Sequence, residues 1–143
     1  MIRRRAMISV ALGVLLLVLG YVHLCSAGAS GVDLAKDHWA AIAKNDLGVT
    51  NMDYVGDAVL EWVGGPLGGK YEGQPAIAGA WVKFFSAQGP LTVDINSIQV
   101  MEEDGKQIVR ARAVFIGKGK VPVDQTLVYD GGRLVSEIWH MHP

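Results

Sequence analysis

The 143-residue chain has little cysteine and, beyond its first five residues, no run of basic side chains. Cys25 is the only cysteine, so no disulfide bond can form within one chain. Residues 30–143 carry ten basic and fourteen acidic side chains, a formal charge of about −4. A mildly acidic domain without a basic stretch is a poor candidate for nucleic-acid binding. We therefore predict no nucleic-acid partner.

A glycine-rich stretch between residues 64 and 73 lacks the chemistry of a phosphate site. A P-loop needs a Lys-Ser/Thr pair at the start of the following helix. Here the expected helix begins with Gln74 and Pro75. The stretch is therefore interpreted as the rim of a small-molecule pocket or as a connector.

One long uncharged segment is present, and it lies at the N-terminus. Met1 to Arg5 include three arginines, and residues 6–24 carry no charged side chain. A basic start before such a run is typical of a signal peptide or a membrane anchor. The positive-inside rule then places the rest of the chain outside the cytoplasm. We expect an extracytoplasmic protein, with the membrane as partner through residues 6–24 if this segment is retained.

The sequence leaves two fates for the N-terminal segment, cleavage and retention. Ala27 and Ala29 offer a signal-peptidase site of the A-x-A type. Lipidation of Cys25 is a minor alternative, because Leu24 in front of it is not a small residue. We assign residues 1–29 to the signal peptide or anchor and residues 30–143 to one domain, since the latter are too few for two.

Helices are predicted first along this domain. One covers residues 33–46, where apolar positions recur at helical spacing. A short second helix is predicted from Thr50, which has capping-box spacing to Asp53, to about Val55. A third covers residues 74–88, with proline in its first turn and glycine after its end.

Extended segments make up the rest. A strand is expected at residues 58–63, and a change in the phase of the apolar positions predicts a β-bulge near residues 96–97. Helices followed by a strand meander indicate an α+β domain whose sheet curls around a helix. The four later strands are predicted at residues 91–101, 107–116, 121–129 and 134–142.

Several segments together resemble the NTF2-like superfamily, in particular its SnoaL-like branch of polyketide cyclases and relatives of ketosteroid isomerase. They are "HWAAIAKNDL", "GDAVLEWVGGPLGG", "YEGQPAIAGAWVKFF" and "YDGGRLVSEIW". The similarity covers residues 33–141. It implies a cone, in which a curved antiparallel sheet and N-terminal helices enclose an apolar pocket, with the loop after the first strand near its mouth. It also implies a homodimer through the outer sheet face, and neither a metal nor a cofactor.

The isomerase chemistry of this family carries over poorly. The resemblance places Trp62 where ketosteroid isomerases have their carboxylate base. Glu61 is adjacent, but neighbouring strand residues point to opposite faces. The oxyanion-binding tyrosine falls at His38 and the protonated aspartate at about Gln125, and both residues can donate hydrogen bonds.

His38 is the first catalytic candidate, because a histidine on the buried stripe of the first helix can polarise a carbonyl or relay a proton. A core histidine satisfied by one internal hydrogen bond is the equal alternative. His140 and His142 share a strand face and could ligate a metal with His38, but two histidines at a strand end are more often solvated. His142 is a further catalytic candidate, because SnoaL-type cyclases use an acidic acid/base residue near this position.

Asp124 has two readings, an outward solvated carboxylate or a pocket acid with a raised pKa. If Gln125 faces inward, Asp124 faces outward. Arg110 and Arg112 are expected on the outer, polar face, solvated or in a dimer contact. We expect pocket-lining residues at Trp62, Trp81, Phe85, Gln125, Trp139 and His140, although aromatic residues suit an ordinary core equally well.

Three functions follow from these residues. The first is a binding module that accepts a small apolar molecule without turning it over. The second is a proton-transfer enzyme, an isomerase, cyclase or dehydratase, that uses His38 with Asp124, Gln125 or His142. The third is a structural dimerisation domain with a filled core.

Overall fold

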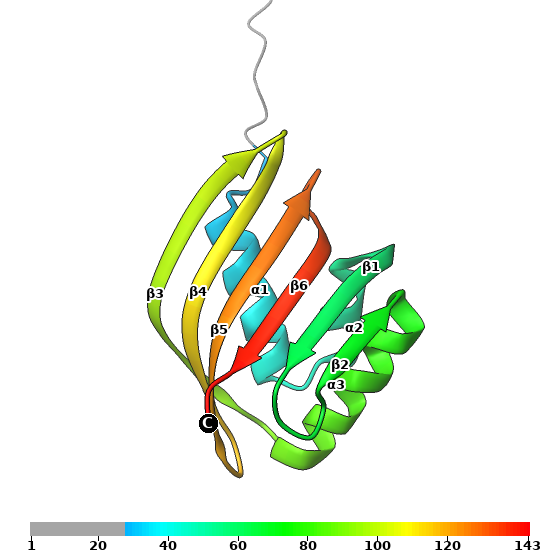
Figure 1. Cartoon of the computed structure of the whole chain (residues 1–143), viewed down its shortest axis with the longest axis vertical. Helices are drawn as coiled ribbons and strands as arrows, with labels where there is room; N and C mark the ends of the chain where they lie inside the picture. The colour runs from blue at the N-terminus through cyan, green and yellow to red at the C-terminus, as the bar shows by residue number, and fades with distance from the viewer. Residues whose placement is uncertain (1–27) are drawn as a thin grey trace, which may run out of the picture.

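The computed structural model describes residues 28–143, in which three helices cover one face of a curved six-stranded sheet (Figure 1). This arrangement confirms the predicted α+β cone. The N-terminal segment assigned to a signal peptide or anchor, including Cys25, lies outside the described residues as far as residue 27. In the described part, no helix combines the length and apolar character needed to cross a bilayer.

The first helix, α1 (Gly31–Ala43), begins two residues earlier than predicted, because Ser30 is its N-cap and accepts a hydrogen bond from the backbone N–H of Asp33. The chain leaves this helix through Asn45, whose φ of 55° is left-handed. The third helix, α3 (Gln74–Gln88), lies where it was predicted.

The second helix corrects the prediction. The helix α2 (Leu47–Met52) starts three residues before Thr50 and ends before Asp53. Asp46 is the N-cap, and its carboxylate accepts the backbone N–H of Val49 at 3.0 Å. Aspartate ranks above threonine as an N-cap residue. Asp53 is consequently the C-cap, which leaves its carboxylate available to the domain interior.

The six strands lie in the order β2-β1-β6-β5-β4-β3. All neighbours are antiparallel except β1 and β6, which run parallel. The predicted bulge near residues 96–97 is confirmed, because the pairing of β3 with β4 shifts register between Ile95 and Ser97. The short strand β2 was not predicted. The strands are β1 (Tyr54–Val63), β2 (Gly69–Glu72), β3 (Thr92–Glu103), β4 (Lys106–Ile116), β5 (Lys120–Asp130) and β6 (Arg133–Met141).

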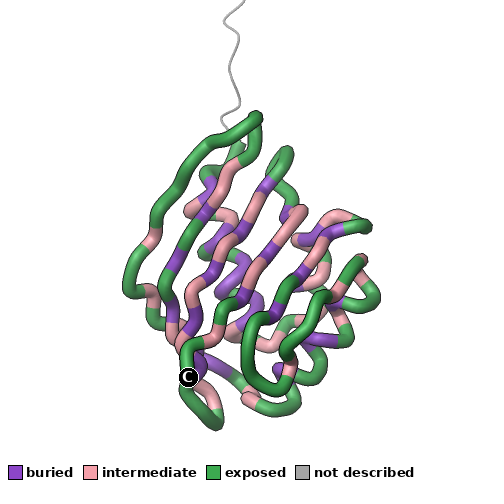
Figure 2. The backbone as a smooth tube through the Cα atoms, viewed as in Figure 1, coloured by how far each residue is buried: buried purple, intermediate pink, exposed green. Residues whose placement is uncertain are grey.

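Burial alternates along the central strands, so that every second residue of β4 and β5 faces the helices (Figure 2). Aromatic rings occupy the interior between β1, β6 and α3. The Trp62 ring centroid lies 4.7 Å from that of Trp139, and the Phe115 ring centroid lies 4.5 Å from that of Trp139. Trp81 and Phe84 pack edge-on against the same indole at 5.2 and 5.4 Å. These rings fill the space in which a hollow cone would hold its ligand.

Candidate functional site

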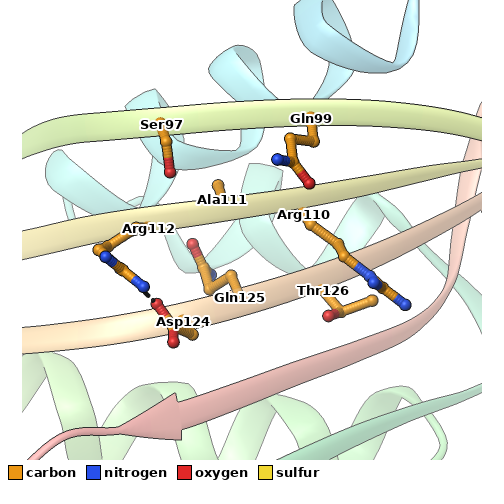
Figure 3. A pocket seen from close by; sticks show the side chains of 8 residues that line it. All are labelled: Ser97, Gln99, Arg110, Ala111, Arg112, Asp124, Gln125 and Thr126. Atoms are coloured by element: carbon orange, nitrogen blue, oxygen red, sulfur yellow. Dashed lines mark hydrogen bonds and ion pairs between the residues drawn. The ribbon is translucent and has the colours of Figure 1, made fainter.

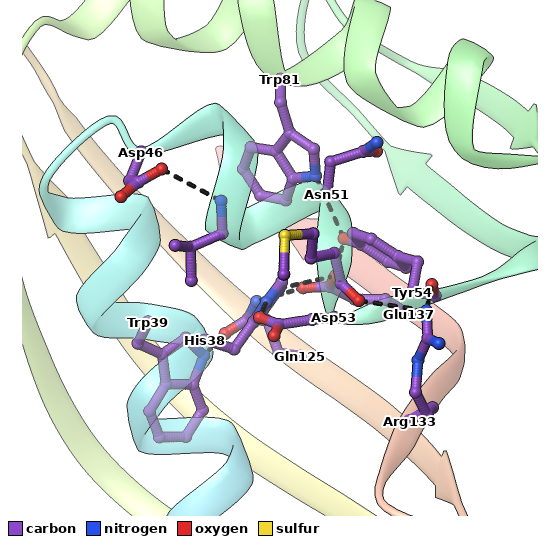
Figure 4. Close-up of polar contacts among 12 residues, drawn as sticks. His38, Trp39, Asp46, Asn51, Asp53, Tyr54, Trp81, Gln125, Arg133 and Glu137 are labelled. Carbon is purple, nitrogen blue, oxygen red and sulfur yellow. Dashed lines mark hydrogen bonds and ion pairs between the residues drawn. The ribbon is translucent and has the colours of Figure 1, made fainter.

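The centre of the domain holds a buried polar network around Glu137, a residue of β6 (Figure 4). One carboxylate oxygen accepts hydrogen bonds from the Gln125 amide, at 2.9 Å, and from the Trp139 indole. The other accepts from the Tyr54 hydroxyl and contacts His38 Nε2 at 3.1 Å. Four partners fill the acceptor capacity of a carboxylate. Glu137 is therefore fully satisfied although it is fully buried.

His38 on α1 joins this network to the surface. Its Nδ1 lies 2.7 Å from the Asp53 carboxylate, while its Nε2 faces Glu137. A neutral imidazole has only one N–H, so two carboxylates on opposite ring nitrogens favour the doubly protonated ring. His38 is completely buried, whereas the Asp53 side chain is 32% exposed. Asp53 is thus the member of the His38–Glu137 network that is open to solvent.

The charges in the network support this protonation state. Burial lowers the pKa of His38, but the Glu137 and Asp53 carboxylates outweigh it and raise the pKa from 6.5 to about 9. Burial likewise works against ionised Glu137, yet His38 and its hydrogen-bond donors bring its pKa below the usual value. The Tyr54 hydroxyl has a pKa well above its usual range, because it is buried beside an anion. At neutral pH the network therefore holds an imidazolium between two carboxylates.

Two indoles donate hydrogen bonds to members of this network. Trp39 Nε1 donates to the Gln125 carbonyl oxygen at 2.8 Å, and Trp81 Nε1 donates to the Tyr54 hydroxyl oxygen at 3.1 Å. Both indoles are buried. Each buried donor thereby has an acceptor, which is the condition under which polar groups are tolerated in a core.

Local structure explains how these residues meet. Trp139 and Glu137 are two residues apart on β6, so both point to the inner face. A register shift in the β5–β6 pairing, between Val128 and Tyr129, leaves Val135 without a partner and brings Leu134 to the inner face as well. Asp53 and Tyr54 stand at the junction of α2 and β1, where the Arg133 guanidinium donates to the carbonyl of Tyr54.

The outer face of the sheet carries Asp124, which lies beside Arg112 (Figure 3). Asp124 pairs with the Arg112 guanidinium at 3.0 Å and with His142 Nε2 at 3.0 Å. These contacts lower its pKa, the Arg112 hydrogen bond being the main cause. Asp124 therefore takes the outward position that follows from an inward Gln125. A polar groove of about 250 Å³ runs here across β3, β4 and β5, past Arg110 and Arg112.

His140 and His142 also lie on this outer face and are exposed. Their ring centroids are 5.6 Å apart, whereas His38 is buried on the inner side of the sheet. The placement of His140 differs from the pocket-lining position expected for it, because Trp139 takes the inward position. Within residues 28–143, the structure gathers no group of three side chains able to hold a metal ion.

An apolar groove lies at the end of the sheet where the chain terminates, next to the loop after β1. We call it the mouth groove. Its volume is about 120 Å³. The buried Trp62 indole forms its inner wall, and its Nε1–H donates a hydrogen bond to Met141 Sδ at 3.0 Å. Its lining residues are Trp62, Pro66, Leu67, Lys83, Phe84, Ala87, Gln88, Val121 and Met141.

The other residues expected on a pocket wall are placed elsewhere. Trp81, Phe85 and Trp139 belong to the packed core, and Gln125 belongs to the polar network. Of the expected set, Trp62 is the one that lines the mouth groove. The predicted cone is present, and side chains fill most of its interior, because four indoles and several phenyl rings share that space.

Glu137, Asp53 and Tyr54 were not identified from the sequence. Glu137 could have been found, since it precedes the inward Trp139 by two strand positions. Asp53 and Tyr54 were hidden by the misplaced second helix. A correct N-cap at Asp46 would have placed both at a helix–strand junction.

No family model and no curated protein matches the sequence. Solved structures do match. An NTF2-like protein of unknown function from Pseudomonas putida is 16% identical with a TM-score of 0.64, over 76% of this chain and 82% of that one. A ketosteroid isomerase-like protein from Erwinia carotovora atroseptica is 13% identical with a TM-score of 0.61, over 78% and 93%.

A Sinorhizobium meliloti protein assigned as a polyketide cyclase is 20% identical with a TM-score of 0.54, over 76% of this chain and 94% of that one. Identities this low indicate a shared architecture and not a shared activity. The resemblance seen in the sequence is thereby confirmed for the fold. The chain has the NTF2-like fold, shared with cyclase-like and isomerase-like proteins.

Proposed function

We propose that this chain is an exported or membrane-anchored binding domain that takes a small apolar group in the mouth groove and does not turn it over. The observation that carries the proposal is the groove itself, in which apolar side chains from four elements converge and Lys83 and Gln88 are the polar members. Export rests on the charge pattern of residues 1–29.

The size of the groove limits the ligand. Pockets for drug-sized molecules usually hold about 300–1,000 Å³, and this groove holds about 120 Å³. An apolar cavity of about 150 Å³ accepts benzene. We therefore infer a ligand, or the protruding part of a ligand, no larger than one six-membered ring.

The polar network supports a role without catalysis. Glu137 has no free acceptor site, and His38 already holds both of its protons. Indoles also stand between the groove and the network: Trp62 lines the groove, its ring lies 5.7 Å from Trp81, and Trp81 donates to Tyr54. A ligand in the groove is therefore separated from the only buried acid/base pair that the described residues contain.

The test is a titration followed by two-dimensional NMR. The protein is expressed from its full coding sequence in an exporting host and studied in the form that the host accumulates. Benzene, toluene and cyclohexanone are the probes. We expect shifts at Leu67, Phe84, Val121 and Met141, and their loss in Leu67→Glu. Val63→Glu is the matched control, because Val63 is exposed on the outer face beside Trp62. Shifts that persist in Leu67→Glu, or that never occur, contradict the proposal.

A proton-transfer enzyme is the second candidate, and the exposure of Asp53 favours it. The Asp53 carboxylate, His38 and Glu137 form a continuous chain from solvent to the buried centre. Such a chain can carry a proton if the interior opens. Exchange of the α-protons of cyclohexanone in D₂O measures this activity directly. Exchange that is faster with the protein than without it, and that disappears in His38→Asn, would replace the first proposal.

A homodimer through the outer sheet face is the last part of the proposal. Arg110 and Arg112 are exposed there beside the polar groove. Two such faces can meet with the arginines of one copy opposite Asp124 of the other. Native mass spectrometry of the wild type and of Arg110→Glu tests this arrangement, which predicts a dimer that the variant loses.

A further inference from the structure

The polar members of the mouth groove are two side chains of α3, Lys83 and Gln88. Lys83 precedes Ala87 by four positions, so the two side chains start from the same helix face, the one that lines the groove. Lys83 is exposed, whereas its neighbour Phe84 is buried. An exposed lysine keeps its stem on apolar surface and its ammonium group in solvent. Lys83 thus belongs to the rim of the groove and Phe84 to its floor.

Lys83 has no partner within the fold. It is the one charged residue of α3, so the helix offers it no carboxylate three or four positions away. A cation in the last turn of a helix interacts with the helix dipole, but Lys83 lies before that turn. In the described part of the chain, Lys83 takes part in no ion pair. Its charge is therefore available to a ligand.

Gln88 adds a second donor to the groove. Its Oε1 accepts the backbone N–H of Gly119 at 3.1 Å, in the turn between β4 and β5. This bond fixes the orientation of the amide, because an N–H must face an oxygen. The Nε2 group is left over, and within residues 28–143 it donates no hydrogen bond. Both polar side chains of the groove thus offer donors, and none of its described lining residues is acidic.

The turn next to Gln88 is basic as well. The backbone N–H of Lys118 donates to the Gln88 carbonyl at 3.0 Å, which holds this turn against the end of α3. Lys118 and Lys120 are exposed, and the turn contains no acidic residue. Residues 30–143 as a whole carry a formal charge of about −4. A local excess of lysines on an acidic domain raises the concentration of anions at this place.

We propose that the ligand of the mouth groove is an anion, in which a small apolar group enters the groove and a carboxylate, or another anionic group, pairs with Lys83 at the rim. This inference rests on the proposed function, since it concerns the same groove. An ammonium group and an amide N–H both suit a ligand group with several acceptor oxygens. The groove holds about 120 Å³, enough for the apolar part alone, so the charged group stays at the solvated rim.

Four probes with one aromatic frame test the charge of the ligand: benzoate, benzamide, benzylamine and toluene. The protein is the form accumulated by the exporting host, in low salt, and two-dimensional NMR follows Leu67, Phe84, Val121 and Met141. We expect benzoate to bind about three- to fivefold more tightly than benzamide, because a rim ion pair is partly screened by solvent. Benzylamine should bind most weakly. In about 1 M NaCl the advantage of benzoate should disappear.

Lys83→Met removes the charge and keeps an unbranched apolar stem. We expect this variant to bind benzoate no more tightly than benzamide. Lys36→Met is the matched control, because Lys36 is also an exposed helical lysine but lines a different groove, between α1 and β3. It should keep the preference of the wild type. A preference for benzoate that persists in Lys83→Met would overturn the proposal.

The toluene titration separates this inference from the proposed function. Toluene shifts at the groove residues, with equal binding of benzoate and benzamide, would overturn the anionic ligand and leave the proposed function standing. If none of the four probes shifts these resonances, both proposals fail. Benzoate shifts confined to Arg110 and Arg112 would place the anion on the outer face and would also overturn the inference.

Discussion

The two faces of the sheet carry similar side chains in opposite circumstances. On the inner face, His38 and Glu137 are buried and held by several hydrogen bonds each. On the outer face, Asp124 and His142 pair at 3.0 Å but are about 40% exposed, at 41% and 43%. The chemistry of the two pairs is alike. Because the inner pair is buried, breaking it should lower the free energy of unfolding strongly. Because the outer pair is exposed, breaking it should change this free energy little.

Removal of Glu137 should have the largest effect. Glu137→Ala leaves the His38 imidazolium with Asp53 alone and four donors without an acceptor. Loss of one partner of a buried pair typically costs about 3–5 kcal/mol. We expect the free energy of unfolding, measured in urea, to fall by about this amount. Glu137→Gln is the control that keeps the shape, and it should cost less. Equal stability of Glu137→Ala and the wild type would contradict the assigned network.

The pH dependence of stability should come from the inner face. The pKa of His38 is about 9 in the folded protein and 6.5 when unfolded. The contribution of His38 to the stability of the folded protein is therefore complete below pH 6.5 and is lost as the pH rises through 9. We expect the free energy of unfolding to fall across this window by at most about 1.4 kcal/mol per pH unit. Urea unfolding at pH 6, 7.5 and 9 measures the slope, which His38→Asn should flatten.

An intermediate effect is expected for the indole that supports Gln125. Trp39→Phe keeps most of the apolar contact and removes the donor to the Gln125 carbonyl oxygen. An unsatisfied buried acceptor costs about 1–3 kcal/mol. Urea unfolding should show a loss in this range. Phe84→Trp is the control, because it changes a buried aromatic ring without removing a hydrogen bond. Its effect on stability reports the cost of altered packing alone.

The smallest effect is expected on the outer face. Asp124→Asn breaks an exposed pair with Arg112 and His142, and such pairs contribute little. We expect a change in stability within about 0.5 kcal/mol. A loss comparable to that of Glu137→Ala would show that the outer face is buried in solution, as in a dimer.

Much of the architecture was predictable from local patterns. The ends of α3 follow from Pro75 and Gly89, and the β3 bulge follows from the change in phase of apolar residues. The inward position of Gln125 required Asp124 to face out, and the structure agrees. The start of α2 was misplaced, because aspartate and threonine both cap helices and Thr50 also has capping-box spacing to Asp53, whereas the structure uses Asp46.

The candidate site was predicted only in part. His38 was found because helical periodicity places it on the buried stripe. Its partners lie 15 and 99 positions away, and the β1–β6 parallel pairing that brings β6 beside β1 has no local signal. The mouth groove was expected near the loop after the first strand, and a cavity is present there. Its small size could not be foreseen.

The sequence by itself determined the order of the helices and of the five longer strands, and which side chains share a face, because periods of 3.6 and 2 residues are local properties of the chain. The tertiary structure decided two further matters. It made His38 the centre of a satisfied charge network, since hydrogen bonds depend on distances between remote segments. It also filled the cone, since free volume depends on how curvature and side-chain size match across the whole interior.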